Sequence, residues 1–384
     1  MTDTVPYSVL QVLPALDAGG VERTVLEVAE ALVAAGHEAH VVSAGGRLVP
    51  ELLELGGRHY TMDVGSKNLA SFPWRVAALR RLIHHVGANV VHARSRAPAW
   101  PAKRAAVAER TPFVTTYHGI YNEGFPGKRR YNSIMASGDL IIANSQYTAD
   151  HIQATHGTRE SRIRVVPRGV DMARFDPTRV SDADVKARRA GWGVPEGAPV
   201  VLLPGRITAW KGGEVAVRAL ELLSDDTHLV LLGDAQGRDW FVAELRALAD
   251  SLGVGERVHL PGHSSDVPTA LAAADVVICP STDPEAFGRT AAEAQAMMRP
   301  VVASSHGGAL ETVADGRTGR LVAPGNYKAL ADAVRTAARL PDVGEAGRRR
   351  IQQHFSKRAM QAGVLAVYSE VLAPDSEPSG PFAS

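Results

Sequence analysis

The sequence is almost free of cysteine: Cys279 is the only one among 384 residues. One thiol cannot form a disulfide within the chain, and it leaves too few ligands for a zinc site of cysteine and histidine. Cys279 stands in the apolar run Asp275–Pro280, so we expect an unreactive core residue. The cysteine content therefore excludes an internal disulfide scaffold and a thiolate metal centre.

Long apolar segments and a strong net charge are also missing. No run of about 18 apolar residues occurs, and no charged segment followed by a long apolar run stands at the N-terminus. The formal net charge is only +1, so no global charge favours nucleic acid as a partner. We therefore expect a cytoplasmic protein that binds no nucleic acid.

The charge is unevenly distributed along the chain. Residues 1–180 hold 21 Lys/Arg against 16 Asp/Glu, whereas the remaining residues hold 21 against 25. Clusters of basic side chains are often solvated helix faces, but they are also typical of surfaces that attract an anionic acceptor or an acidic membrane. The clusters of the N-terminal half are Arg94 and Arg96, Lys103 and Arg104, and Lys128, Arg129 and Arg130.

Short β-branched runs alternate with helical patterns in two series. The first series occupies residues 9–166 and the second residues 199–304. In the first series, the expected helix Leu48–Leu55 is followed directly by the expected helix Pro73–Val86. The alternation predicts an α/β fold of βαβ units, with parallel sheets covered by helices on both faces.

A chain of this length suits two domains. The charged segment Asp176–Pro199 contains proline and glycine and separates the two series, so we place the domain junction there. The sequence thus predicts an N-terminal domain at residues 1–180 and a C-terminal domain at residues 195–356. A final helix, at about residues 357–372, is expected to pack back on the N-terminal domain.

Two loops that each follow a predicted strand suit anionic ligands. Gly19 and Gly20 allow a ligand close to the backbone, and the helix N-terminus beyond them attracts an anion, although a tight turn without a ligand is the simpler alternative. These glycines do not form the three-glycine dinucleotide fingerprint. In the loop Gly205–Gly213, Arg206 and Lys211 suit a diphosphate, unless they are merely exposed loop cations.

A third loop follows the strand that ends at Cys279. Glu285 lies in this loop, the amides of Phe287 and Gly288 lie near the start of the next helix, and Glu293 lies about one turn into it. The two carboxylates suit a general acid and base, or acceptors of hydrogen bonds from sugar and ribose hydroxyls. Their position adds weight, because open α/β folds bind ligands at the carboxyl edge of the sheet.

One histidine is expected at the corresponding edge of the N-terminal sheet. His118 ends the strand Phe113–Tyr117. A lone histidine is more often structural than a ligand contact, but this one shares its strand edge with Gly19 and Gly20. The shared edge favours a ligand contact.

Together these segments resemble family 4 of the GT-B glycosyltransferases, from Gly19 to about Gly325. Glu285 and Glu293 stand as the glutamate pair of that family, with seven residues between them, and Gly205–Gly212 matches its diphosphate clamp. The resemblance implies two Rossmann-like, doubly wound parallel-sheet domains with an interdomain cleft; the first domain would bind the acceptor and the second the nucleotide sugar. Further matching landmarks are Gly233-Asp234, Pro261-Gly262, Gly307-Gly308, Glu311 and Asp315–Gly319.

The resemblance also implies a retaining transfer of a hexose without a metal. The donor phosphate or sugar would meet Gly19 and Gly20, and Arg206 and Lys211 would neutralise the diphosphate leaving group. No Asp-x-Asp motif stands at a strand end, so we expect no metal and no cofactor, the nucleotide sugar being a substrate. The remaining implied contacts are those of His118 and Glu285 with the transferred sugar, of the Phe287 and Gly288 amides with the same sugar, and of Glu293 with the ribose.

A closer resemblance concerns the acceptor. The segments His92–Trp100, Tyr117–Tyr121 and Lys128–Asn132 resemble the lipopolysaccharide-core mannosyltransferases of alpha-proteobacteria. That resemblance implies transfer of mannose from GDP-mannose to an anionic, lipid-linked acceptor, with peripheral contact at the cytoplasmic face of the inner membrane. The acceptor-binding residues that it implies are Arg94, Arg96, Lys128 and Arg129.

Other functions remain open on the sequence. A UDP-sugar-dependent enzyme of the same family or a nucleotide-sugar 2-epimerase would use the same fold, and a nicotinamide-dependent dehydrogenase would need the missing glycine fingerprint. The charged residues of the donor site argue together against a catalytically silent binding protein. One position departs from the family: Met298 stands where members often have a glycine that ends the helix, so we expect a different helix exit there.

Overall fold

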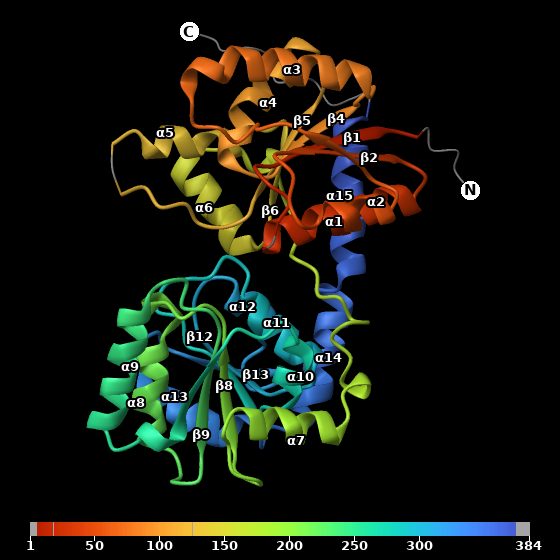
Figure 1. The fold of residues 1–384 in the computed structure, drawn as a ribbon. Helices are drawn as coiled ribbons and strands as arrows, with labels where there is room; N and C mark the ends of the chain where they lie inside the picture. Colours follow the sequence, from red (N-terminus) through yellow and green to blue (C-terminus); the bar gives the residue numbers. More distant parts are fainter. Residues whose placement is uncertain (1–5, 18, 125, 374–384) are drawn as a thin grey trace. The chain divides into compact units, whose positions relative to one another are not determined.

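The computed structural model describes residues 6–17, 19–124 and 126–373. The chain divides into two compact units (Figure 1). Unit 1 comprises Met1–Arg168 and Arg358–Ser384, and unit 2 comprises Gly169–Lys357. Each unit is built around its own parallel sheet, so the α/β class predicted from the alternating pattern is confirmed.

The sheet of unit 1 has seven parallel strands in the order β3-β2-β1-β4-β5-β6-β7. Because side chains alternate along a strand, Leu10 and Val12 enter the core on one face, and Val9 and Leu13 that on the other. The strands are β1 (Ser8–Val12), β2 (Glu38–Ser43), β3 (Arg58–Thr61), β4 (Val90–Ala93), β5 (Phe113–Tyr117), β6 (Leu140–Ala143) and β7 (Ile163–Val165).

Helices cover both faces of this sheet. Side chains of α3 and α4 belong to the core that contains Leu10, whereas those of α1 and α15 belong to the core that contains Val9. The helices of unit 1 are α1 (Gly20–Ala34), α2 (Val49–Glu54), α3 (Phe72–His85), α4 (Arg96–Ala108), α5 (Lys128–Asn132), α6 (Gln146–His156) and, from its second residue, α15 (Lys357–Val371).

Unit 2 repeats this plan with six parallel strands in the order β10-β9-β8-β11-β12-β13. Its strands are β8 (Val200–Pro204), β9 (His228–Leu232), β10 (Val258–Gly262), β11 (Val276–Cys279), β12 (Val301–Ser304) and β13 (Gly319–Val322). Its helices are α7 (Asp182–Gly191), α8 (Gly213–Leu220), α9 (Asp239–Ser251), α10 (Val267–Ala272), α11 (Arg289–Ala296), α12 (Ala309–Thr312), α13 (Tyr327–Ala337) and α14 (Val343–His354). Throughout the described residues, every helix is too short or too polar to traverse a bilayer.

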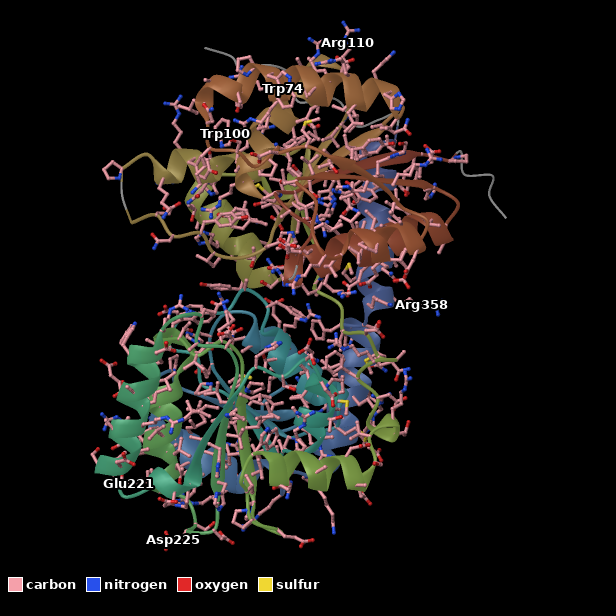
Figure 2. All side chains as sticks on the ribbon, viewed as in Figure 1. Trp74, Trp100, Arg110, Glu221, Asp225 and Arg358 are labelled. Atoms are coloured by element: carbon pink, nitrogen blue, oxygen red, sulfur yellow. The ribbon has the colours of Figure 1, made fainter. Side chains whose placement is uncertain are left out.

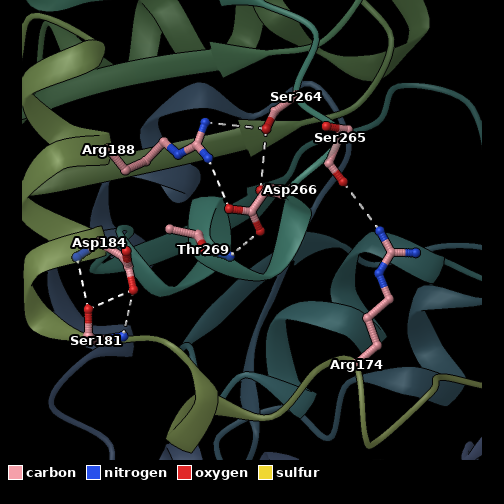
Figure 3. A network of polar contacts seen from close by, with 8 residues as sticks. All are labelled: Arg174, Ser181, Asp184, Arg188, Ser264, Ser265, Asp266 and Thr269. Atoms are coloured by element: carbon pink, nitrogen blue, oxygen red, sulfur yellow. Dashed lines mark hydrogen bonds and ion pairs between the residues drawn. The ribbon is translucent and has the colours of Figure 1, made fainter.

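Helix α7 lies inside unit 2, although the sequence places the domain junction across it. The side chain of Arg188 binds Asp266, the residue that caps α10, at 3.0 Å (Figure 3). Ser181 and Asp184 form a reciprocal capping box that fixes the start of α7. Since α7 is anchored on α10, the boundary between the units falls at Gly169, before the predicted junction.

Two edge strands were not predicted. The strand β3 lies in the segment between the expected helices Leu48–Leu55 and Pro73–Val86, and β13 follows the second predicted series. Each has four residues, and neither forms a long β-branched run: β3 reads Arg-His-Tyr-Thr and β13 reads Gly-Arg-Leu-Val. Short edge strands that are only partly buried carry little of the pattern by which strands are recognised.

Each sheet reverses its strand order at one point. In unit 1 the reversal lies between β1 and β4, and in unit 2 it lies between β8 and β11. At such a point the loops that leave the two strands run in opposite directions and leave room for a ligand at the carboxyl edge. The loops that carry Gly19 and Arg94 flank the first point, and those that carry Lys211 and Glu285 flank the second.

Met298 does not change the exit of α11. Its φ is 59°, the left-handed conformation that a glycine would adopt. The Arg299 amide donates to the Ala294 carbonyl at 2.9 Å, which is the bond that closes a helix C-terminus in this geometry. The expectation of a different helix exit is therefore wrong, because Met298 adopts the left-handed conformation that a glycine would adopt there.

We expect Met298→Gly to be more stable than Met298→Ala by about 1 kcal/mol, because a Cβ atom in the left-handed region costs roughly that much. Both variants lose the same side chain, so their difference isolates the backbone. In an ordinary helical position the order is reversed, glycine being the less stable residue. Urea unfolding of the two variants measures the difference, and an alanine variant as stable as the glycine variant would contradict the left-handed strain.

Candidate functional site

In unit 2, the loops after β8 and β11 bring a cation and a carboxylate together. Lys211 Nζ lies 2.8 Å from Glu285 Oε1, and these two side chains are only 13% and 17% exposed. The Ser281 hydroxyl donates to the same oxygen of Glu285 at 2.6 Å. The pair therefore joins the two strands that flank the reversal point of the sheet.

Glycine and backbone hydrogen bonds allow this close approach. Gly212 has a φ of 79°, and a Cβ atom there would lie 2.0 Å from the Pro280 carbonyl oxygen. The Thr282 amide donates to the Trp210 carbonyl at 2.8 Å, which ties the second loop to the first. A larger residue at position 212 would push the two loops apart, and with them Lys211 and Glu285.

Arg206 and Lys211 share one aromatic neighbour. The Lys211 ammonium lies 4.6 Å and the Arg206 guanidinium carbon 6.0 Å from the centre of the Trp210 ring. Both distances are in the range of cation–π contacts. Trp210 thus holds the two predicted diphosphate ligands on the same loop, where they can act on one anion.

Glu293 and the start of α11 lie beyond Glu285. Glu293 accepts a hydrogen bond from Arg289 Nε at 2.6 Å, one turn earlier on the helix. Gly288 caps this helix in a left-handed conformation, with a φ of 77°. The Phe287 ring is buried against Phe355, with centroids 5.7 Å apart, so only the Phe287 backbone can face a ligand.

The Glu285 backbone is held from the other side by the loop after β12. The Gly308 amide donates to the Glu285 carbonyl at 2.8 Å. Gly307 approaches so closely that a Cβ atom would lie 2.4 Å from the same carbonyl oxygen. Cys279 lines the small cavity beside this loop, and burial raises the pKa of its thiol to about 12, in accord with an unreactive residue.

In unit 1, His118 is half-buried and directly follows β5. Burial and the charges of Arg94 and Arg168 lower the pKa of His118 well below its ordinary value, so its imidazole is neutral at pH 7. Arg168 Nη2 lies 3.3 Å from His118 Nδ1. A guanidinium only donates, so Nδ1 is the acceptor and Nε2 carries the proton. Nε2 has no hydrogen-bond partner among the described residues.

Arg94 is buried beside this histidine and not displayed on the surface. Its side chain is only 1% exposed, and Nη1 lies 3.3 Å from both ring nitrogens of His92. Two further nitrogens, Nε and Nη2, have no hydrogen-bond partner in the described part of the chain. Burial lowers the pKa of Arg94 to about 10, which leaves it charged at pH 7. Arg94 therefore sets the positive potential around His118.

The other predicted residues of unit 1 lie at the start of α1 and on or beside α5. Gly19, with a φ of 140°, caps α1, and Gly20 is the first residue of that helix. Arg96 stacks on the Tyr121 ring at 4.3 Å and binds Asn132 Oδ1 at 2.8 Å. Lys128 and Arg129 stand on the short helix α5, where Arg129 is exposed and donates to the Thr155 carbonyl.

Several contacts could not be read from the sequence. Ser281 and Trp210 hold the Lys211–Glu285 pair, and Arg168 and Asn144 hold His118, the latter by donating to its carbonyl at 3.0 Å. Only the Arg289–Glu293 pair, four residues apart on one helix, leaves a signal in the sequence. In the ranges that the structure describes, no group of three or more His, Cys, Asp or Glu side chains is placed to hold a metal ion.

Two family models match the chain, one in each half. Residues 18–174 match Glycosyltransferase Family 4, and residues 184–357 match Glycosyl transferases group 1. A D-inositol 3-phosphate glycosyltransferase of Xylanimonas cellulosilytica is 39% identical over 62% of this chain and 58% of its own length. The chain thus spans somewhat less than two thirds of that curated relative.

Solved structures match over nearly the full length. A glycosyltransferase from Rickettsia africae is 34% identical with a TM-score of 0.89, covering 97% of this chain and all of its own. HepE from Anabaena, solved with UDP and glucose, is 26% identical with a TM-score of 0.81, covering 94% of this chain and 99% of its own. With both sheets, the paired glutamates and these relatives in agreement, the chain belongs to the family 4 glycosyltransferases of GT-B fold.

Proposed function

We propose that this glycosyltransferase moves a hexose from a nucleoside diphosphate sugar to an acceptor that carries an anionic group, with retention of configuration and without a metal. The observation that carries the proposal is the Lys211–Glu285 pair, held at 2.8 Å across the reversal point of the sheet in unit 2. A cation there suits a diphosphate, and a carboxylate beside it suits sugar hydroxyls.

The diphosphate would be the leaving group. As the bond between the anomeric carbon and the phosphate oxygen breaks, negative charge grows on the diphosphate, and Arg206 and Lys211 would stabilise it. Both cations lie beside Trp210 on one loop, and Lys211 would exchange Glu285 for the diphosphate. In a retaining same-face attack, the acceptor oxygen bonds to the anomeric carbon and its proton passes to the leaving phosphate.

The hexose would be held by neutral and anionic partners. Glu285 would accept from the sugar hydroxyls, helped by the Phe287 and Gly288 amides at the start of α11, and Glu293 would accept from the ribose. In unit 1, the Nε2–H group of His118 would donate to a sugar oxygen, and the anionic donor would meet Gly19 and Gly20. Arg94 is a positioning residue in this scheme, since it is buried.

Two donors are proposed, which differ in the base and in the sugar. HepE, at 26% identity, was solved with UDP and glucose, which supports a UDP-hexose donor. The resemblance of His92–Trp100 to lipopolysaccharide-core mannosyltransferases supports GDP-mannose. Both donors fit the proposed diphosphate site, so the base is the first property to measure.

The donor is identified by thermal unfolding of the full chain with UDP, GDP and ADP, followed by transfer assays with the matching sugars. The correct nucleotide at a hundredfold excess over its Kd should add about 2.7 kcal/mol of stability. Transfer should persist in EDTA, because side chains supply the compensating charge. A strict need for Mg²⁺ or Mn²⁺, or epimerised donor in place of a glycoside, would contradict the proposal.

Lys211→Ala and Arg206→Ala should each lower kcat roughly a hundredfold to a thousandfold, the usual loss when one group that stabilises the transition state is removed. Arg218→Ala is the matched control, since Arg218 pairs within α8, with Glu214 four residues earlier. Thermal unfolding of Lys211→Ala checks that the protein still folds when Glu285 has lost its ion-pair partner. Lys211→Gln is a second variant, which removes the charge but keeps a polar side chain. Rates like those of the control would remove both cations from the mechanism.

The acceptor would be bound through its anion by Arg96, Lys128 and Arg129. The relative named D-inositol 3-phosphate glycosyltransferase takes a phosphorylated acceptor by its name, which supports an anion here. These three cations lie close in the fold, since Arg96 binds Asn132 at the end of α5, the helix that begins at Lys128. Arg96 is partly buried, whereas Arg129 is exposed and can meet a solvated anion.

Replacing Lys128 and Arg129 together by alanine should raise the KM for an anionic acceptor and leave the KM for the donor unchanged. D-inositol 3-phosphate and unphosphorylated inositol form the test pair, with a Kdo-containing lipid as the third acceptor. The effect should shrink with salt, since the screening length falls from about 10 Å at 0.1 M to about 3 Å at 1 M. Arg246→Ala with Lys328→Ala, two exposed cations of unit 2, is the matched control. Equal acceptor KM values in both double variants would leave Lys128 and Arg129 as plain surface charges.

A further inference from the structure

One segment of unit 1 displays apolar side chains outside any core. Leu69, in the 3₁₀ turn Leu69–Ser71 that precedes α3, is 82% exposed, and Trp74 in the first turn of α3 is 58% exposed (Figure 2). Pro73 between them is also exposed. Contiguous exposed apolar surface often marks an interaction site, so this patch is a candidate docking surface.

The exposure of Leu69 is built into the fold. Arg75 is only 3% exposed and reaches back under the turn, where Nη1 donates to the Val64 carbonyl at 3.2 Å and Nη2 to the Asn68 carbonyl at 3.0 Å. The Asn68 side chain accepts from the Ala70 amide at 2.9 Å and caps the turn. The buried guanidinium and the cap hold Leu69 outward, because the backbone of the turn is fixed from both sides.

The segment that carries the patch contains basic residues and no acidic ones. From Val64 to Ala108 the sequence contains no Asp or Glu, but eight Lys and Arg residues. Two of these cations, Arg75 and Arg94, are buried and two are exposed close to the patch: Lys67, two residues before Leu69, and Arg81, two turns after Trp74 on the same helix. The patch is therefore an apolar tip bordered by cations.

We infer that the patch formed by Leu69, Pro73 and Trp74 docks unit 1 on an anionic lipid bilayer, with Lys67 and Arg81 facing the headgroups. Tryptophan and leucine partition into the boundary between headgroups and acyl chains, and each nearby Lys or Arg adds attraction to anionic lipid. A nucleic acid would take the cations but offers no apolar layer for the leucine. The docking is independent of which sugar is transferred, and it would place the enzyme at the surface where a lipid-linked acceptor lies.

Sedimentation of the full chain with vesicles tests the inference. Vesicles of phosphatidylcholine alone are compared with vesicles that contain equal amounts of phosphatidylcholine and phosphatidylglycerol. Leu69→Ser with Trp74→Ser removes the apolar tip, and Lys67→Gln with Arg81→Gln removes the cations. The matched control is Trp240→Ser, because Trp240 on α9 of unit 2 is 61% exposed and thus displays an equally accessible indole.

The wild type and the Trp240→Ser variant should bind the anionic vesicles and hardly bind the neutral ones. Loss of the apolar tip should lower the partition coefficient at least about tenfold, and loss of each cation about fivefold. Vesicle binding should weaken in high salt for the wild type. Stabilisation by UDP or GDP should be the same in all variants, so a failure of docking is distinguishable from a failure of the donor site.

Three results would overturn the inference. Anionic vesicles that leave the wild type in the supernatant would exclude the bilayer as partner. If the wild type and the variant that lacks Leu69 and Trp74 had equal partition coefficients on anionic vesicles, the vesicles would be bound by another part of the protein. A wild type that is dimeric in light scattering, with the same variant monomeric, would show that the patch covers a second copy of the chain.

Discussion

The ion pair between Lys211 and Glu285 is the contact on which the proposed donor site depends. Both side chains are largely withdrawn from water, so their desolvation is compensated only by good geometry and by further hydrogen bonds. Ser281 supplies one such bond, and the close passage of Gly212 beneath Pro280 supplies the geometry. A diphosphate that displaces Glu285 from Lys211 would free the carboxylate for sugar hydroxyls, so one partner exchange would serve both ends of the donor. The pair can thus keep the site assembled when no donor is bound.

In unit 1 the corresponding edge is organised by buried positive charge. Burial and the charges of Arg94 and Arg168 together keep the imidazole of His118 neutral. A neutral imidazole with its Nδ1 turned to Arg168 has a single defined tautomer, and its Nε2–H can donate to a sugar. Asn144 fixes the backbone of the same residue through its carbonyl. The arginines are therefore groups that set the protonation state of His118, whereas the exposed cations of α5 and α3 are the ones that we propose to act on partners outside the fold.

The sequence was sufficient for features that depend on long patterns. The α/β class, both parallel sheets and the family follow from alternation and from motifs that each stand after a strand, because the carboxyl ends of parallel strands must meet at one edge. Features that depend on a single contact in the folded chain could not be predicted from the sequence. Met298 adopts a glycine conformation because Gly344 and the closing bond to Ala294 fix the turn, and no pattern encodes that. The strand β3 is short and partly exposed, and the burial of Arg94 depends on side chains as distant as Tyr368, which bonds its neighbour His92.

The basic residues of the N-terminal half thus occupy at least two kinds of environment. A charge that enters a core, as in Arg75 and Arg94, costs desolvation and is tolerated only where it fixes a turn or a neighbouring ring. A charge that stays in water, as in Lys67, Arg81 and Arg129, costs little and acts over the screening length. The acid-free span from Val64 to Ala108 contains both kinds. A carboxylate inside would pair with a buried arginine and cancel its field at His118, and one outside would repel an anionic surface.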